Sequence, residues 1–391
     1  MDATHDYALL LLPSHNRVYA RESARLARAE LLVLDEAVLG GRIEEIEERT
    51  LGGVRYLTFR APRLGGEDLA QLANLSGLYA LFERTGETLT PVTVERLDKF
   101  PDDLITIQKY VGKTNEDFTK LLLNVTAYSC AHPGRLLTGR LRVLDPLASR
   151  GTTLNQAVMY GLDAAGVERD PKSFDAYQNF FRQWLKNTRL KHHADLGPVR
   201  RDHRTLGRRL AVTLGVDKER YRAGETIDVT AVNADTTAAG DFFAAGSFDL
   251  IVTDAPYGVQ HGSRARDAGA SARSRSPLPL LAEALPVWRR LLRPGGAVGI
   301  AWNTQVARRA ELTALLAEVG LAVRESEPYL GFAHRVDQAI TRDLVVAVRP
   351  TATTAGSAGS ADSTDSTGRP AGRLTGGTGY RSSPVRTITR S

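Results

Sequence analysis

Four clusters of acidic and small residues, each placed directly after a predicted strand, carry the chemistry that this sequence offers. Each cluster follows a short run of apolar or β-branched residues and supplies carboxylates or backbone groups. In open α/β sheets, ligands bind beside the carboxyl ends of the strands, so we expect these clusters at one edge of one sheet. The clusters are residues 145–153, Glu168, residues 233–235 and residues 254–257.

The first two clusters are typical of a site for a ligand that contains a ribose. Asp145 begins a turn of small residues that includes Gly151, and a helix is predicted to follow it. Such a turn lets the backbone approach a ligand closely, and the first turn of the helix offers free N–H groups. The spacing from Gly151 to Glu168 is close to the roughly 20 residues at which an acid binds ribose hydroxyls.

Residues 140–349 carry the pattern of the sheet that must hold these clusters. Strands and helices alternate along this part of the chain, which favours an α/β fold with a mostly parallel sheet. We expect strands at 141–144, 164–167, 226–232, 248–253, 297–302 and 344–348, and helices at 153–161, 278–292 and 306–319.

The chain divides into three regions. Residues 1–100 form a smaller α+β domain, with expected strands at 7–12 and 56–59 and a helix at 20–30. Residues 101–349 form the α/β domain, which contains a basic insertion at 172–220. Residues 350–391 are rich in Gly, Ser and Thr, and this tail is expected to be disordered because it has too little apolar surface to bury.

Taken in order, the four clusters resemble the amino-methyltransferase branch of the class I S-adenosylmethionine-dependent methyltransferases. That family has an Asp-Pro-x-x-Gly-x-Gly turn, an acid for the ribose, an Asp near the adenine and an Asp/Asn-Pro-Pro-Tyr/Phe/Trp loop. The resemblance covers residues 105–349. It implies a Rossmann-like domain with a mostly parallel seven-stranded sheet, methyltransferase activity and S-adenosylmethionine as the cofactor. It assigns cofactor binding to Asp145, Ser149, Gly151, Thr152, Glu168 and Asp235.

The same resemblance assigns catalysis to Asp254, Ala255, Pro256 and Tyr257. The Asp254 carboxylate and the Ala255 carbonyl would accept the hydrogens of an exocyclic base amine and stabilise the positive charge that develops on its nitrogen. Tyr257 would stack on the base. The sequence departs from the family pattern twice, because Ser149 replaces a glycine and Ala255 replaces a proline. A serine crowds the turn if its position needs a positive φ.

The distribution of charge points to a polyanionic partner. The chain of 391 residues has a net charge of +6, and nine Lys/Arg lie between positions 182 and 209 against two Asp. Cations in such numbers suit nucleic-acid phosphates, although a solvated basic surface has the same pattern. A second group lies in the loop after the catalytic motif. The expected nucleic-acid-binding residues are Arg189, Lys191, Arg200, Arg201, Arg204, Arg264 and Arg266.

An N-terminal domain followed by this catalytic domain is similar to the THUMP-containing tRNA guanine-N2 methyltransferases. Thr253-Asp254-x-Pro256-Tyr257-Gly258 is close to their Thr-Asp-Pro-Pro-Tyr-Gly. The resemblance implies guanine N2 of tRNA as the target and an RNA-binding role for residues 1–100. Two alternatives stay open: a DNA adenine-N6 or cytosine-N4 methyltransferase, and a non-catalytic nucleic-acid-binding protein on the same fold. A small activator protein is a further partner that the sequence leaves open.

Composition argues against several other classes of protein. No apolar run reaches the roughly 18–20 residues that span a bilayer, and the first residues lack the pattern of a signal peptide. Cys130 is the only cysteine, which excludes an intramolecular disulfide. His192-His193 lacks a third ligand at metal spacing, so we expect no metal site. These features predict a cytoplasmic protein without a membrane partner.

Overall fold

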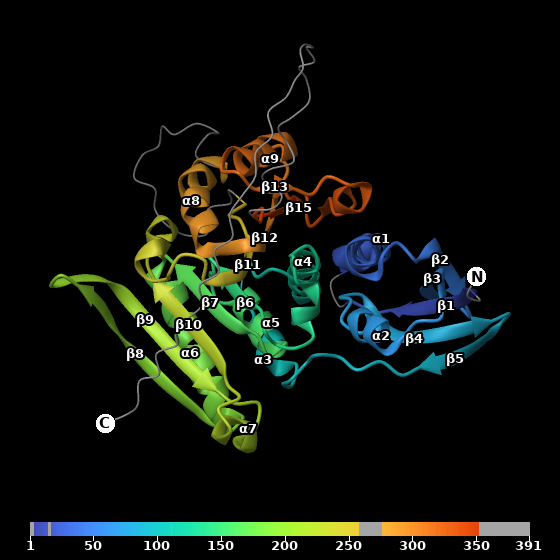
Figure 1. The fold of residues 1–391 in the computed structure, drawn as a ribbon, viewed down its shortest axis with the longest axis horizontal. Coiled ribbons are helices and arrows are strands. Elements are labelled where there is room, and N and C mark those ends of the chain that lie inside the picture. Colours follow the sequence, from blue (N-terminus) through green and yellow to red (C-terminus); the bar gives the residue numbers. More distant parts are fainter. Residues whose placement is uncertain (1–3, 15–16, 111, 258–275, 352–391) are drawn as a thin grey trace, which may run out of the picture.

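The computed structural model describes residues 4–14, 17–110, 112–257 and 276–351, which form two β-sheets with helices around them (Figure 1). Arg264, Arg266 and the expected disordered tail from residue 352 onward lie outside the described residues. Within the described ranges, the helices are too short or too polar to cross a membrane.

The N-terminal unit is an antiparallel five-stranded sheet in the order β2-β3-β1-β4-β5. The helix α1 is amphipathic: its arginines at positions 21, 25 and 28 are exposed, while Leu26 and Leu31 are fully buried. The elements are β1 (Thr4–Leu11), α1 (Arg17–Leu34), η1 (Asp35–Leu39), β2 (Glu44–Leu51), β3 (Val54–Pro62), α2 (Gly66–Leu72), β4 (Leu78–Thr85) and β5 (Thr88–Val92).

The second sheet has ten strands, in the order β13-β15-β12-β11-β6-β7-β10-β9-β8 with β14 paired to β15. Its strands are β6 (Arg142–Asp145), β7 (Asp163–Glu168), β8 (His192–Arg201), β9 (Arg204–Leu214), β10 (Ile227–Asn233), β11 (Phe248–Asp254), β12 (Leu292–Asn303), β13 (Ala322–Val323), β14 (His334–Arg335) and β15 (Thr341–Val348). Its helices are α3 (Asp103–Thr106), α4 (Glu116–Tyr128), η2 (Pro133–Leu136), α5 (Thr152–Met159), α6 (Pro171–Asn187), α7 (Lys218–Arg222), η3 (Thr236–Asp241), α8 (Leu278–Leu291), α9 (Arg309–Glu318) and η5 (Glu327–Leu330).

Helices cover both faces of the central strands, which explains why β11 is apolar along its whole length. Side chains alternate between the faces of a strand. Leu250 and Val252 pack with residues of α4, α5 and α6, whereas Ile251 packs with residues of α8 and α9. A strand that is buried on both sides reads as a continuous apolar run, as in parallel sheets generally.

The expectation of a mostly parallel, seven-stranded sheet is wrong in number and in direction. Only the five central strands, β12, β11, β6, β7 and β10, run parallel. The other pairings are antiparallel. The hairpin β8–β9 comes from the stretch that the sequence suggested was a basic insertion. Because this stretch is rich in charged residues, its sequence does not indicate that β8 and β9 pair and extend the sheet by two strands.

The N-terminal unit and the ten-stranded sheet share a buried core, and α1 lies beside α4 (Figure 1). Glu30 of α1 is fully buried at this junction. Its carboxylate accepts hydrogen bonds from the Ser76 N–H at 3.0 Å and from Asn124 Nδ2 of α4 at 2.8 Å. A buried carboxylate is retained only where donors satisfy it, so these bonds fix α1 against α4.

Candidate active site

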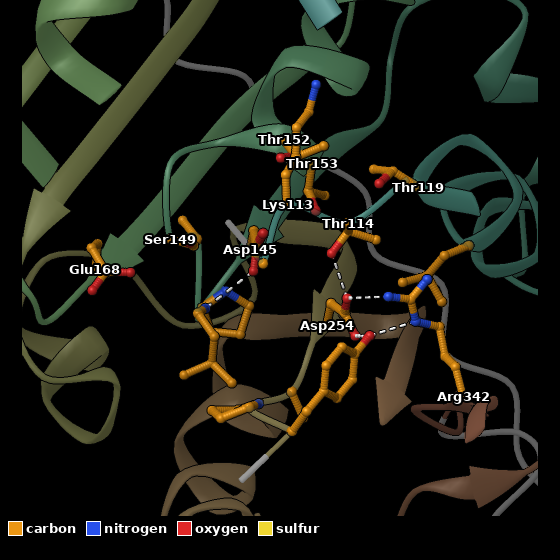
Figure 2. A pocket seen from close by; sticks show the side chains of 18 of the residues that line it. Lys113, Thr114, Thr119, Asp145, Ser149, Thr152, Thr153, Glu168, Asp254 and Arg342 are labelled. Atoms are coloured by element: carbon orange, nitrogen blue, oxygen red, sulfur yellow. Dashed lines mark hydrogen bonds and ion pairs between the residues drawn. The ribbon is translucent and has the colours of Figure 1, made fainter. Parts of the chain in front are cut away.

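A cavity of about 680 Å³ opens at the carboxyl ends of β6, β7, β10 and β11. The predicted catalytic residues all line it, and so do the predicted cofactor-binding residues apart from Gly151. Residues from four different strand ends therefore meet in one space. Figure 2 shows Glu168 and Ser149 at one end, Arg342 at the other, and Asp145 and Asp254 between them.

The turn after β6 is held by the buried carboxylate of Asp145. Asp145 accepts hydrogen bonds from the Leu147 N–H at 3.1 Å and from Thr253 Oγ1 at 2.8 Å, which ties the turn to β11. Burial raises the pKa of Asp145 to about 6, against these hydrogen bonds. The turn and the end of β11 are therefore one hydrogen-bonded unit.

Ser149 and Gly151 both adopt left-handed backbone, with φ of +47° and +81°. The departure from glycine at Ser149 therefore falls at a position where a side chain is disfavoured. Gly151 has a different constraint. A Cβ at this position would lie 2.2 Å from Cε2 of Tyr177 in α6. Gly151 thus permits close packing between the turn and α6.

The acids at the ends of β7 and β10 differ in environment. Burial raises the pKa of Glu168 to about 7, although its carboxylate accepts a hydrogen bond from the Asp170 N–H at 2.6 Å. Asp235 caps η3 by accepting hydrogen bonds from the Thr237 side chain and N–H, and these bonds lower its pKa. Arg169 lies 3.5 Å from Asp235. Both acids present hydrogen-bond acceptors to the cavity.

Asp254 lies at the centre of a cluster of donors (Figure 2). Its Oδ2 accepts a hydrogen bond from Thr114 Oγ1 at 2.5 Å and lies 3.7 Å from Nη2 of Arg342. Its Oδ1 accepts a hydrogen bond from the Tyr257 hydroxyl. Burial, followed by the charge of Asp254, raises the pKa of Tyr257 well above its usual value, so this hydroxyl keeps its proton.

Arg342 and Thr114 are site residues that the sequence reasoning missed. Arg342 of β15 is only 3% exposed, and its guanidinium lies 4.5 Å from the ring centroid of Phe118 and 5.2 Å from that of Tyr257. The pair of charged residues Arg342-Asp343 before the apolar run that starts at Leu344 is its only signal in the sequence. Thr114 directly precedes Asn115, which caps α4 by accepting a hydrogen bond from the Phe118 N–H.

The segment before α4 contributes further to the wall of the cavity. The Tyr110 hydroxyl lies 3.0 Å from Thr152 Oγ1, and the Arg150 guanidinium lies 4.7 Å from the Tyr110 ring centroid. Lys113 Nζ donates a hydrogen bond to the Ile105 carbonyl at 2.7 Å. These contacts hold residues 112–114 beside the turn and Asp254.

The predicted nucleic-acid-binding residues that the structure describes lie outside the cavity. Those that the structure describes are exposed residues of the β8–β9 hairpin and of the loop before it: Arg189, Lys191, Arg200, Arg201 and Arg204. Within the described ranges, no group of three His, Cys, Asp or Glu side chains could hold a metal ion. Cys130 is buried.

Comparison with known proteins identified similar chains among solved structures. No family model matches the chain, and no curated protein matches it. A TehB-like SAM-dependent methyltransferase from Corynebacterium glutamicum is 15% identical, with 55% of this chain and 85% of that chain covered and a TM-score of 0.30.

Two further similar structures are a cofactor-bound enzyme and a complex. The magnesium protoporphyrin IX methyltransferase from Synechocystis, solved with bound SAM, is 10% identical over 63% of this chain and 90% of that chain, with a TM-score of 0.35. A chain of a fibrillarin/Nop5p complex is 14% identical over 54% of this chain and 73% of that chain, with a TM-score of 0.29.

Proposed function

We propose that this protein is a class I S-adenosylmethionine-dependent methyltransferase that methylates an exocyclic amine of a base in RNA, with guanine N2 of tRNA as the target. One observation carries the proposal: the acids that end β6, β7 and β11, together with Asp235 just after β10, line a single cavity. Such a cavity would hold a ribose-containing ligand next to a carboxylate that lies beside an aromatic ring. The proposed location of the reaction is the cytoplasm.

The cavity suits the proposed cofactor in size and in chemistry. Ligand pockets are usually about 300–1,000 Å³, and this one is about 680 Å³. Glu168 would accept hydrogen bonds from the ribose hydroxyls, and Asp235 would accept one from the adenine amine. Asp145, Ser149 and Thr152 would line the part that holds the methionine portion. When bound, S-adenosylmethionine supplies an electrophilic methyl group.

Asp254 would act as an acceptor for the target amine. A base amine is a poor nucleophile because its lone pair is delocalised into the ring. Acceptors at Asp254 and at the Ala255 carbonyl favour a localised lone pair and stabilise the developing positive charge. In the structure the Tyr257 hydroxyl donates a hydrogen bond to Asp254 Oδ1. The arriving amine would take over this hydrogen bond and leave the Tyr257 ring free to stack on the base.

The choice of RNA rests on the motif and on charge. Thr253 to Gly258 resembles the loop of tRNA guanine-N2 methyltransferases in five of its six positions. Exposed arginines on the β8–β9 hairpin offer sequence-independent affinity for phosphates. A duplex DNA substrate and a non-catalytic binding role are the competing functions, and a small activator protein is an additional partner to look for.

The test is methyl transfer from radiolabelled S-adenosylmethionine to undermodified tRNA, followed by nucleoside analysis. We expect label in a methylated guanosine. Asp254→Ala should abolish transfer, because it removes the carboxylate that would accept hydrogen bonds from the amine. Asp102→Ala is the matched control, since it makes the same change at an exposed residue whose side chain forms no capping hydrogen bond.

Two outcomes would redirect the proposal. Transfer to duplex DNA but not to tRNA would favour the DNA amino-methyltransferase. Absence of cofactor binding in calorimetry at millimolar S-adenosylmethionine would favour a non-catalytic nucleic-acid-binding protein.

A further inference from the structure

The predicted nucleic-acid-binding residues of the β8–β9 hairpin lie at two opposite ends of its strands. In the antiparallel pairing of β9 with β10, Arg208 lies opposite Asn233, the last residue of β10. The part of β9 before Arg208 therefore extends past the carboxyl end of β10 (Figure 1). The cavity lies at the same end of the central strands. The cations of this hairpin tip are Arg200, Arg201 and Arg204.

The other two predicted nucleic-acid-binding residues that the structure describes lie at the other end of the hairpin. Arg189 and Lys191 come just before β8, whose first residue, His192, pairs with Leu214 at the end of β9. One continuous basic stretch in the sequence thus becomes two separate groups, because a hairpin carries its two ends apart along the strand direction. Of the two groups, only the hairpin tip lies at the same end of the strands as the cavity.

Local geometry fixes the position of the hairpin tip. Asp202 and His203 have φ of +50° and +62°, as a two-residue type I′ turn requires. Arg201 donates a hydrogen bond to Asp241 Oδ1 at 3.0 Å and another to the Asp241 carbonyl at 2.6 Å. Asp241 ends η3, the helix that Asp235 caps at the cavity wall. The tip is therefore fastened to an element of the site.

Not all cations near the tip are engaged within the protein. Arg201 is paired with Asp241, and Arg208 is paired with Asp175 at 2.9 Å. Arg200 and Arg204 are exposed and form no ion pair with the described residues. Cations held in a fixed place without acidic partners are suited to bind phosphate groups.

The distance to the catalytic carboxylate indicates which part of a substrate would reach the tip. Four strand spacings separate β11 from β9 in the sheet order, which amounts to about 19 Å. A base bound at Asp254 cannot extend so far. Only the backbone of neighbouring nucleotides, in a substrate larger than the target itself, can reach it.

We propose that the hairpin tip binds the phosphate backbone of a folded RNA, away from the nucleotide held at Asp254. The proposal rests on the proposed function for its substrate class. It adds that Arg200 and Arg204 position the RNA, while Arg189 and Lys191 do not contribute to this surface. Such contacts supply affinity and orientation and carry no sequence information.

The experiment compares two double variants that remove the same charge. Arg200→Gln with Arg204→Gln neutralises the tip, and Lys218→Gln with Arg222→Gln neutralises exposed cations of α7, near the opposite edge. Binding of undermodified tRNA is measured by fluorescence anisotropy as a function of salt, alongside the KM for tRNA and kcat. All four side chains are exposed, so melting temperatures should match that of the wild type.

The tip variant should weaken tRNA binding about tenfold at low salt and reduce the slope of log K against log salt by about 2. Its KM for tRNA should rise in parallel, with kcat at saturation and the affinity for S-adenosylmethionine unchanged. The α7 variant should match the wild type. Equal behaviour of the two variants would overturn the proposal while leaving the proposed function intact.

The nucleic-acid class is tested separately. If the tip variant loses affinity for duplex DNA but not for tRNA, then RNA is the wrong occupant. If the wild type binds tRNA through the tip but transfers no methyl group to it, then the proposed function fails while the binding surface stands.

Discussion

The two oxygens of the Asp254 carboxylate meet different neighbours. Oδ2 lies between the Thr114 hydroxyl and the Arg342 guanidinium, and Oδ1 accepts the Tyr257 hydroxyl. Arg342 also donates a hydrogen bond to the Tyr257 oxygen. A planar guanidinium can serve both partners at once, which an ammonium group does less well. Arg342 therefore sets the geometry of the pair that the proposed chemistry needs.

Arg342→Met should lower kcat for methyl transfer about a hundredfold, because a misplacement of about 1 Å at the reacting groups is enough for such a loss. The dissociation constant for S-adenosylmethionine should change less than about twofold, since Glu168 lies at the other end of the cavity (Figure 2). Single-turnover kinetics and calorimetry separate the two effects.

Breaking a buried ion pair also destabilises a protein, by about 3–5 kcal/mol. Arg342→Lys is therefore the second variant, because it keeps the positive charge and loses the planar guanidinium that serves both partners at once. It should recover part of kcat. An unchanged kcat in a folded Arg342→Met protein, or an equal loss of cofactor affinity, would contradict a positioning role.

Glu168 should make cofactor binding depend on pH near neutrality. Its pKa is raised to about 7 by burial, and ribose hydroxyls donate hydrogen bonds to the ionised carboxylate. Affinity for S-adenosylmethionine should therefore be greatest above pH 7 and fall as the pH decreases through the pKa of Glu168, by up to about tenfold per unit. Calorimetry between about pH 5 and about pH 9 measures it.

Glu168→Gln should bind the cofactor more weakly at high pH and lose most of this dependence. Asp145, with a pKa of about 6, contributes the remainder at lower pH. A pH profile that is the same in the wild type and in Glu168→Gln would assign the dependence to another group.

At the scale of elements, the turn between β6 and α5 shows how packing restricts the sequence. The backbone at Gly151 is left-handed, and the position where a Cβ would lie is already filled by Tyr177 of α6. Gly224 has nearly the same φ, +78°, but its Cβ would meet no atom within 4 Å. Substitutions at these two glycines therefore separate the cost of backbone strain from the cost of overpacking.

Gly224→Ala should destabilise the protein by about 1–2 kcal/mol, the penalty of a side chain in left-handed backbone. Gly151→Ala should lower the free energy of unfolding by a further 1–3 kcal/mol or so, because the Tyr177 ring must move. Urea unfolding of both variants measures the difference. Equal losses would show that α6 gives way freely.

The elements that sequence reasoning located are those with strong local signals. Residues 248–253 were predicted as a buried strand and form most of β11, since a continuous apolar run after a turn has few other solutions. The predicted helix at 278–292 is α8. Placement of the acids at strand ends followed from these strands.

What sequence reasoning did not find depends on contacts between distant residues. β8 has few apolar residues and is mostly exposed, so its pairing with β9 leaves little apolar alternation to detect. Arg342 reaches Tyr257 across 85 positions of the chain. No local sequence pattern can reveal such a contact, because it forms only when folding brings Arg342 of β15 close to Tyr257.

At the scale of the whole molecule, Glu30 links the two units. Three donors point at its carboxylate, two from Ser76 and one from Asn124. Asn124 also donates to the Asn74 carbonyl, and the Tyr160 hydroxyl donates to Asn124 Oδ1. This buried network joins α1, α4 and α5, so unfolding of one unit exposes unsatisfied donors in the other.

Glu30→Ala should therefore lower the free energy of unfolding of the whole chain by about 3–5 kcal/mol, because a cavity and several buried unpaired donors remain. Thermal unfolding should show one transition at a lower temperature, monitored by circular dichroism. Glu36→Ala is the matched control, since Glu36 is more exposed and bonds only Ser326 Oγ. A separate early transition for the N-terminal unit would contradict this coupling.

The edges of the two sheets have a consequence for behaviour in concentrated solution. Unpaired edge strands invite strand addition from a second molecule, and proline or charge on the edge prevents it. Here β8 carries Pro198, β5 carries Pro91, and β13 and β14 have two residues each. The remaining edge, β2, is lined with exposed glutamates at 44, 45, 47 and 48. Each edge is thus blocked, so the hairpin can stay long and basic without seeding aggregates.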